Sequence, residues 1–189
     1  MCRGMIHDQR LVDQLSVLPV ERFEGEVFRT TRAGADPIAP SVNGGRWAPP
    51  PNNGSEVSVL YTSMERDGSI AEVASILAGL SPIPGPRQLN ISRLGVSTAR
   101  TQRFARTSLE RLGVDMMRYH ERDYYRTQEI GAALAFLELD GLITPSARWS
   151  CDNLMIFTAN HSLNERLVVI DTEEIEWRSW AQTHGFLGK

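Results

Sequence analysis

The chain has 189 residues, of which 41% are hydrophobic, and a formal net charge of −3. This length suits one domain with a core of its own, and the composition is that of an ordinary globular protein. The small negative charge gives no electrostatic reason to expect nucleic acid or an anionic membrane as a partner. No apolar run reaches the roughly 18 residues of a membrane-spanning helix, and the first ten residues lack the apolar centre of a signal peptide. We therefore expect a cytoplasmic protein.

The usage of cysteine, histidine and lysine narrows the possible chemistry. Cys2 and Cys151 do not make a disulfide scaffold, and the four histidines are scattered without zinc-type spacing, so no metal is expected. Lys189 is the only lysine, which excludes a Walker A loop and argues against Schiff-base chemistry. No GxGxxG motif follows a predicted strand, so a dinucleotide would not be held in the Rossmann manner.

Taken in chain order, the predicted elements alternate unevenly. Strands come early and late with helices between them, which favours a mixed α+β domain over a regular parallel βαβ array. We expect an N-terminal helical extension over 1–22, a main domain over 23–171, and a C-terminal tail over 172–189 that packs on it. The patterns predict helices over 4–22, 69–80, 108–117 and 126–139 (the last capped by Gly141), strands over 24–31, 57–63, 89–96, 153–158 and 166–170 with an extension through 175, and a long loop over 33–55.

Two arginines are the first candidate site residues. Arg29 lies in an apolar-flanked strand pattern, where it either points to solvent or projects into a cleft and grips phosphate oxygens with its guanidinium fork. Gly44-Gly45-Arg46-Trp47 follows in the long loop. Paired glycines allow a tight backbone path, and the tryptophan would pin the loop to the core. Arg46 is then either solvated or available to assist Arg29.

An aromatic residue, a carboxylate and a hydroxyl complete the candidate set. Tyr61 ends a predicted strand, where its ring either fills the core or lines a cleft. Ser69 and Glu72 fit a capping box that would close the first turn of a helix, but Glu72 also lies beside the apolar stripe of that helix, where it could face a cleft. Ser146 follows a proline in a turn-like stretch, which is typical of a capping or turn serine.

The order and spacing of these residues resemble those of RES-domain toxins from bacterial toxin–antitoxin pairs. The resemblance covers about residues 24–171, and Ala48 replaces the asparagine that usually follows the aromatic residue of the loop. The matching segments are Phe28-Arg29, Gly44-Gly45-Arg46-Trp47, Leu60-Tyr61-Thr62, Glu72, and Pro145-Ser146-Ala147 ahead of Asn153-Leu154.

The resemblance implies a fold like that of ADP-ribosyltransferases, with small central sheets and flanking helices. It also implies consumption of NAD⁺ by cleavage of the nicotinamide–ribose bond, through hydrolysis or phosphorolysis, and neutralisation by an Xre-type helix-turn-helix antitoxin. No cofactor is expected beyond NAD⁺ as substrate. In these terms Arg29, assisted by Arg46, would hold the diphosphate and Tyr61 would stack on nicotinamide or its ribose. Glu72 would stabilise the ribosyl cation and Ser146 would orient the ligand.

Two other functions compete with this one. The same fold could transfer ADP-ribose to a protein, and water, phosphate and a protein all stay open as the acceptor. Alternatively, the chain is a non-catalytic binding module that docks nucleic acid through the arginine-rich stretch 87–111, although a solvated basic face is the more common meaning of such a stretch.

Overall fold

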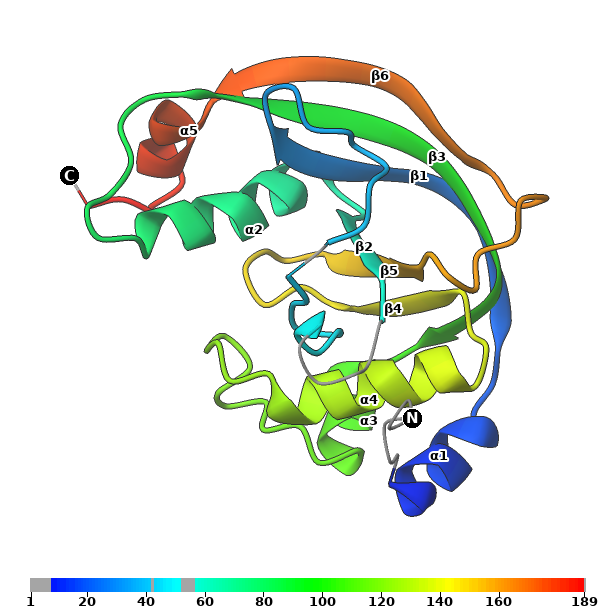
Figure 1. Ribbon diagram of the computed structural model, residues 1–189. Helices are drawn as coiled ribbons and strands as arrows, with labels where there is room; N and C mark the ends of the chain where they lie inside the picture. Colours follow the sequence, from blue (N-terminus) through cyan, green and yellow to red (C-terminus); the bar gives the residue numbers. More distant parts are fainter. Residues whose placement is uncertain (1–7, 42, 52–56, 189) are drawn as a thin grey trace.

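The computed structural model describes residues 8–41, 43–51 and 57–188 and shows a mixed α+β domain, as predicted (Figure 1). Its elements in chain order are α1 (Gln9–Ser16), β1 (Glu21–Arg32), β2 (Val59–Ser63), α2 (Arg66–Ala78), β3 (Gln88–Arg103), α3 (Arg106–Arg111), α4 (Tyr125–Phe136), β4 (Gly141–Pro145), β5 (Asp152–Phe157), β6 (Leu167–Glu176) and α5 (Trp177–Thr183).

The six strands form one strongly curved sheet with the order β1-β2-β5-β4-β3-β6. An additional pairing of β1 with β3 closes the first five strands into a ring. The 16-residue strand β3 makes this possible, because β1 runs along one of its edges while β6 and the parallel strand β4 share the other. In Figure 1 the strands β1, β3 and β6 form an upper layer that arches over a lower layer of the shorter strands β2, β5 and β4.

The ring is weakest between β1 and β2. These two strands share a single register pair, Phe28 with Ser63, whereas β2 pairs with β5 along its whole length. The two strands share no other register pair among the described residues, and residues of both strands line the cleft described below. Helix α2 follows β2 directly and contacts β1, β2 and β3.

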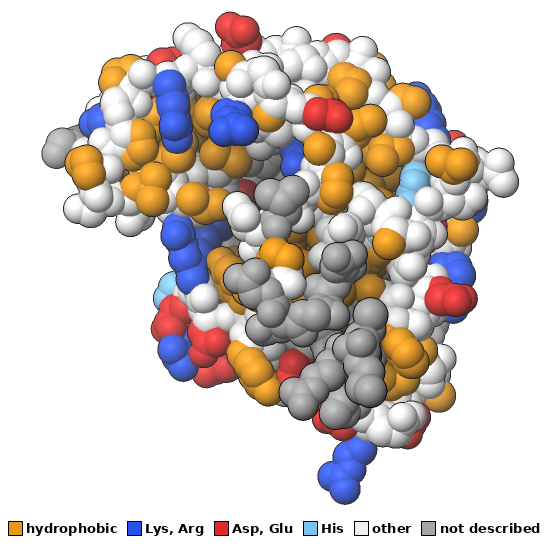
Figure 2. Space-filling model, viewed as in Figure 1, with side chains coloured by type: hydrophobic (Ala, Val, Ile, Leu, Met, Phe, Trp, Pro, Cys, Tyr) orange, Lys and Arg blue, Asp and Glu red, His pale blue; other side chains and the backbone are white. Residues whose placement is uncertain are grey.

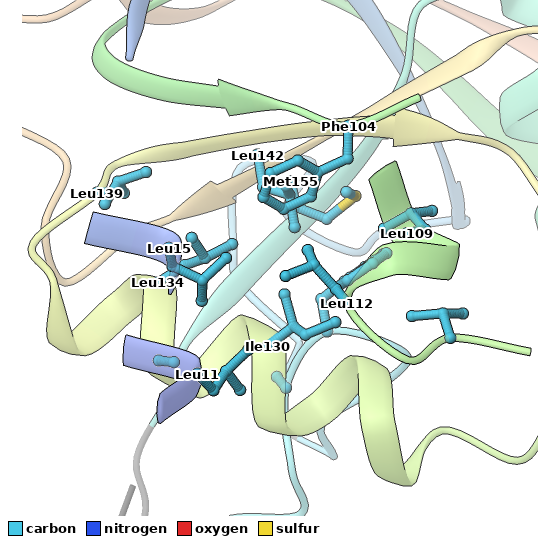
Figure 3. Packing of buried hydrophobic residues seen from close by; sticks show 14 of the residues in the cluster. Leu11, Leu15, Phe104, Leu109, Leu112, Ile130, Leu134, Leu139, Leu142 and Met155 are labelled. Atoms are coloured by element: carbon cyan, nitrogen blue, oxygen red, sulfur yellow. The ribbon is translucent and has the colours of Figure 1, made fainter. Parts of the chain in front are cut away.

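The lower layer is covered by α1 and α4, which pack on it in the largest core cluster. Figure 3 shows Leu11 and Leu15 of α1 against Ile130 and Leu134 of α4. All four side chains are buried. The first helix is therefore docked on the core.

Two smaller clusters complete the core. One lies between the layers and includes Val27 of β1 and Ile156 of β5. The other packs α2 and α5 against the upper layer, with Ile70, Trp177 and Trp180 among its members. The predicted tail over 172–189 begins inside β6, which runs to Glu176. The chain then forms α5, whose Trp177 and Trp180 are buried.

The ends of several predicted helices were wrong. Helix α1 is shorter than 4–22, and the chain is already in β1 at Glu21; the start of that prediction, and Cys2, lie outside the described residues. The helix predicted over 108–117 ends at Arg111, because Gly113 has a φ of +85° and leaves the helical region. Helix α4 ends at Phe136.

The prediction that Gly141 caps a helix was wrong, because Gly141 is the first residue of β4. A Cβ there would lie 2.3 Å from Oγ1 of Thr101, so glycine allows β3 and β4 to approach closely. Strand β4 and helix α5 were not predicted at all, and β3 continues past residue 96 to Arg103.

The loop predicted over 33–55 falls partly outside the described residues. Within those residues, no helix has both the length and the apolar character to cross a membrane.

Candidate active site

A cleft of about 330 Å³ opens where β1 and β2 diverge. Its walls come from β1, the segment around Gly44 to Trp47, β2, α2, the segment from Tyr119 to Tyr124, and the strands β4 and β5. In the space-filling view, a notch at the left of the molecule lies between its upper and lower parts, with apolar side chains above it and basic ones below (Figure 2). The cleft is lined by four of the five predicted site residues, Arg29, Arg46, Tyr61 and Glu72.

Arg29 projects into the cleft from β1, so the solvent-facing alternative does not hold. Its Nη1 donates hydrogen bonds to the carbonyl oxygens of Pro37 (3.2 Å) and Ala39 (2.6 Å), which ties the chain after β1 back onto the strand. Burial lowers the pKa of the guanidinium, but arginine stays charged at neutral pH. Both hydrogen bonds use one terminal nitrogen, so as far as the described residues go the other side of the fork keeps its donors for an anion.

The paired glycines shape the loop that carries Arg46. Gly44 has a φ of +72°, a conformation that glycine adopts without strain. A Cβ on Gly45 would lie 2.6 Å from the hydroxyl oxygen of Tyr61, so the tyrosine ring can reach the loop only because the side chain is absent. The Gly45 N–H donates to the Ala48 carbonyl (2.8 Å) and closes the turn through the backbone. Ala48 itself is fully buried, so this turn needs no polar side chain at that position.

Helix α4 anchors the same loop from below. Trp47 is buried, with 2% of its surface exposed. Its carbonyl oxygen lies so close to Gly131 of α4 that a Cβ there would be only 1.8 Å away. Gln128, one turn earlier on α4, donates to the carbonyl of Gly45 (2.9 Å). The loop is therefore held in one position by packing and by hydrogen bonds.

Arg46 lies between two tyrosine rings. Its guanidinium carbon is 4.5 Å from the ring centre of Tyr119 and 4.6 Å from that of Tyr124, which is the geometry of cation–π contacts. Its Nη2 also donates to the carbonyl of Glu121 (3.3 Å). Arg46 is thus fixed rather than solvated. Neither tyrosine was predicted as a site residue; the three arginines and three tyrosines within 118–126 were the available signal.

Tyr61 serves both the core and the cleft. Its ring packs against the main core cluster and lines the cleft, and its hydroxyl accepts a hydrogen bond from the Trp47 backbone N–H (3.1 Å). Burial raises the pKa of the phenol well above its ordinary value. The side chain is therefore neutral at physiological pH, and it offers the cleft an aromatic surface.

Glu72 reaches the cleft because one face of α2 lines the cleft while another packs in the core. The capping-box prediction was wrong, since α2 begins at Arg66 and Ser69 lies inside the helix, where its hydroxyl is paired with that of Thr30 on β1 (2.8 Å). The positions that face the cleft are Ser69, Glu72, Val73 and Ile76, and those that pack in the core are Ile70, Ala71, Ala74 and Leu77.

Two donors hold the carboxylate of Glu72. Its Oε1 accepts hydrogen bonds from Oγ of Ser146 and from Nδ2 of Asn153, each at 2.8 Å. Ser146 is almost fully buried, and its Oγ accepts the backbone N–H groups of Arg148 (3.0 Å) and Trp149 (3.2 Å). The serine therefore lies behind Glu72, where it supports the carboxylate. Asn153, on β5, was not recognised from the sequence.

The other features considered from the sequence, a metal site, the cysteines and the arginine-rich stretch, do not form a second site among the described residues. Among the described residues, no three His, Cys, Asp or Glu side chains are grouped as the ligands of a metal would be, and Cys151 is a free thiol. The absence of a metal from the chemistry stays a prediction. In the arginine-rich stretch, Arg93 pairs with Glu26 and Asp171 and Arg103 pairs with Glu21 and Asp152. These ion pairs argue against an open basic surface for nucleic acid.

Comparison with known proteins agrees with the predicted family. One chain in the crystal structure of the M. tuberculosis MbcT–MbcA toxin–antitoxin complex shares 16% sequence identity with this chain and superimposes with a TM-score of 0.78. The match covers 94% of this chain and 98% of that one, which shows a common fold. No curated protein matches the sequence. The family model of the RES domain matches residues 21–178, and the chain therefore belongs to the RES domain family.

Proposed function

We propose that the protein is an NAD⁺-consuming toxin of a toxin–antitoxin system and that it breaks the nicotinamide–ribose bond in the cleft. The observation that carries the proposal is the environment of Glu72. Its carboxylate is fixed by two hydrogen bonds in a cleft that also holds Arg29, Arg46 and Tyr61. A fixed negative charge, two cations and an aromatic face match the parts of a dinucleotide that ends in a pyridinium ring.

The two arginines would bind the diphosphate. Arg29 keeps part of its guanidinium fork for an anion, and Arg46 is held in place by Tyr119 and Tyr124. Guanidinium groups bind phosphate oxygens through paired, charge-assisted hydrogen bonds. With the diphosphate held at these two points, the nicotinamide riboside half would be directed toward Tyr61 and Glu72.

The nicotinamide–ribose bond would then break without a proton or a nucleophile from the protein. As the C1′–N bond breaks, its electron pair goes to the pyridinium nitrogen, so nicotinamide leaves as a neutral molecule and no proton needs to be supplied. The positive charge moves to the ribose, where the carboxylate of Glu72 would stabilise it, as carboxylates stabilise the cation in glycoside cleavage. Water would then add to C1′ and release a proton to the solvent, or a phosphate anion would add there instead. Ser146 acts in this scheme by supporting Glu72.

The proposal includes a partner, a cognate helix-turn-helix antitoxin of the Xre type, and residence in the cytoplasm. The similarity to a chain of a toxin–antitoxin complex supports an antitoxin partner. Transfer of ADP-ribose to a protein is the second candidate, because the same cation could be captured by a protein nucleophile instead of water or phosphate.

Product analysis tests the proposal and separates its versions. Purified protein is incubated with NAD⁺ with and without phosphate, and the nicotinamide and the ADP-ribose products are separated. Loss that depends on phosphate and yields a phosphorylated ADP-ribose indicates a phosphorylase, whereas loss without phosphate indicates hydrolysis. Label from NAD⁺ on a protein band supports the transferase. Unchanged NAD⁺ and no labelled protein would contradict the proposal.

A further inference from the structure

The two donors at Glu72 converge on the same oxygen. Ser146 and Asn153 both donate to Oε1, and none of the described residues donates to Oε2. A carboxylate held at one oxygen by two donors from different elements cannot rotate freely about its last bond. The second oxygen is left without a protein donor among the described residues, on a side chain that lines the cleft.

Asn153 occupies a rigid position for this purpose. On β5 it pairs with Ser63 of β2 on one side and with Thr144 of β4 on the other, so its backbone lies in the middle of the lower layer. Only the amide nitrogen of an asparagine can donate to a carboxylate, so Glu72 determines which way the amide is turned. The side chain cannot flip without losing this hydrogen bond.

This orientation has a cost within the protein. Oδ1 of Asn153 is buried and has no hydrogen-bond partner among the described residues. A buried acceptor without a partner destabilises a fold, and an apolar β-former at a central strand position would avoid that cost. The fold keeps a costly polar side chain whose one hydrogen bond to a described residue goes to Glu72.

We infer that Asn153 is a positioning residue, which holds Oε1 of Glu72 so that the other carboxylate oxygen faces the reacting C1′ atom. The inference rests on the proposed function and adds to it a residue outside the set predicted from sequence. Ser146 supplies the second donor, and its own orientation is fixed by two backbone N–H groups. The charged and titratable groups around Glu72 are Arg29 on β1, Arg46 and Tyr61 at the loop and β2, Tyr119 and Tyr124 on the facing segment, and Cys151 ahead of β5.

Asn153→Ala tests the inference by removing the donor. A misplacement of a reacting group by about 1 Å can cost about 100-fold in rate. We therefore expect kcat for NAD⁺ loss to fall by about 10- to 100-fold with KM changed less than about twofold, because the groups that bind the diphosphate are untouched. Unfolding temperature and circular dichroism establish that the variant is folded.

Asn153→Asp gives a signature that a purely structural role would not produce. The two side chains have the same shape, but aspartate can donate to Glu72 only while it is protonated, and two ionised carboxylates at this distance repel each other. The carboxyl pair holds its last proton to a higher pH than an isolated carboxyl would. Activity should therefore be retained at acidic pH and lost as pH rises through the upper apparent pKa of the pair. The pH profile of the wild-type protein should not show this loss of activity with rising pH.

Asp152→Asn is the matched control. This substitution makes the opposite change of charge at the preceding residue, and the carboxylate that it removes pairs with Arg103 outside the cleft. The Asp152→Asn variant should therefore keep the wild-type pH profile. Wild-type kcat in folded Asn153→Ala, or a wild-type pH profile in Asn153→Asp, would overturn the inference.

A crystal structure of Asn153→Ala gives an answer that does not depend on turnover. The expected result is a Glu72 side chain turned from its wild-type orientation, and an unmoved carboxylate would overturn the inference. If wild-type protein left NAD⁺ intact, the proposed function would fail, and this structure would still decide whether Asn153 positions Glu72.

Discussion

The polar side chains of the cleft are held by the protein itself. Arg46 lies between Tyr119 and Tyr124, Tyr61 accepts a hydrogen bond from the backbone, and Glu72 accepts two. Groups that are already in place need little reorganisation when charge develops in a substrate, which is the main source of electrostatic catalysis. At the scale of single residues the site is therefore preorganised.

Tyr124 offers a direct test of this fixation. Tyr124→Ala removes one of the two rings that hold Arg46, so the guanidinium becomes mobile and loses a cation–π contact worth about 0.5–2 kcal/mol. We expect KM for NAD⁺ to rise by roughly 2- to 30-fold, on the scale of 1.4 kcal/mol for each factor of ten, with kcat nearly unchanged. Tyr124→Phe keeps the ring and should behave as wild type. Equal KM values for the two variants would show that the ring does not hold Arg46.

The sequence identified the site residues whose signal is local. Arg29, Arg46, Tyr61 and Glu72 belong to motifs of a few residues, and the structure brings all four to one cleft. Asn153, Tyr119 and Tyr124 were missed because each contacts a residue far away in the chain. The arginines and tyrosines of 118–126 and the segment Asn153-Leu154 stand out locally, but a short window does not show which distant residue they contact. Ser146 was found as well, and its hydroxyl donates a hydrogen bond to Glu72; its contact with the ligand stays a prediction. The assignment of roles to all of these residues stays a prediction.

At the scale of elements, the loop that carries Arg46 depends on a glycine of its own and on a glycine of α4. Gly131 of α4 lies against the Trp47 carbonyl, and Gly45 leaves room for Tyr61. The sequence predicted α4 and the glycine pair but misjudged other glycines. Gly141 was interpreted as a helix cap, whereas close contact between β3 and β4 explains it, and a contact between distant strands leaves no periodic signal.

Gly131→Ala should destabilise the protein although alanine is the better helix former. The intrinsic helix preference favours alanine by about 1 kcal/mol, but its Cβ would lie 1.8 Å from the Trp47 carbonyl oxygen. Overpacking of this kind costs about 1–3 kcal/mol or more, so the free energy of unfolding in urea should fall. Gly85→Ala is the control, because a Cβ there meets nothing within 4 Å. An unchanged or raised unfolding free energy for Gly131→Ala would contradict the close packing of α4 on the loop.

At the scale of the whole molecule, the N-terminal helix and the C-terminal helix are built into the core. Leu15 of α1 is fully buried, and its carbonyl accepts a hydrogen bond from Gln102 on β3 (2.8 Å). Trp177 of α5 is fully buried as well. The fold class followed from the uneven alternation of helices and strands, but the closing of five strands into a ring depends on pairings between strands distant in sequence, which periodicity does not reveal.

Leu15→Ala measures how much the first helix contributes. Replacing a buried leucine by alanine costs about 2–5 kcal/mol, and we expect a loss of that size in the free energy of unfolding, with a single cooperative transition. Val17→Ala, at a side chain with 81% of its surface exposed, should change stability by less than about 0.5 kcal/mol. A loss below about 1 kcal/mol for Leu15→Ala would mean that α1 is an appendage that the domain does not need, since core truncations of this kind rarely cost so little.

The rate of NAD⁺ loss with purified wild-type protein and with Glu72→Gln is the most direct test of the central proposal. Glutamine keeps the shape of the side chain but removes the negative charge that would stabilise the ribosyl cation. Losing one such electrostatic contact typically slows a reaction by about 100- to 1000-fold, and we expect a loss of this size with an unchanged unfolding temperature. A folded Glu72→Gln variant that loses less than about tenfold in rate would contradict the role given to Glu72, because removal of a preorganised charge costs more than that.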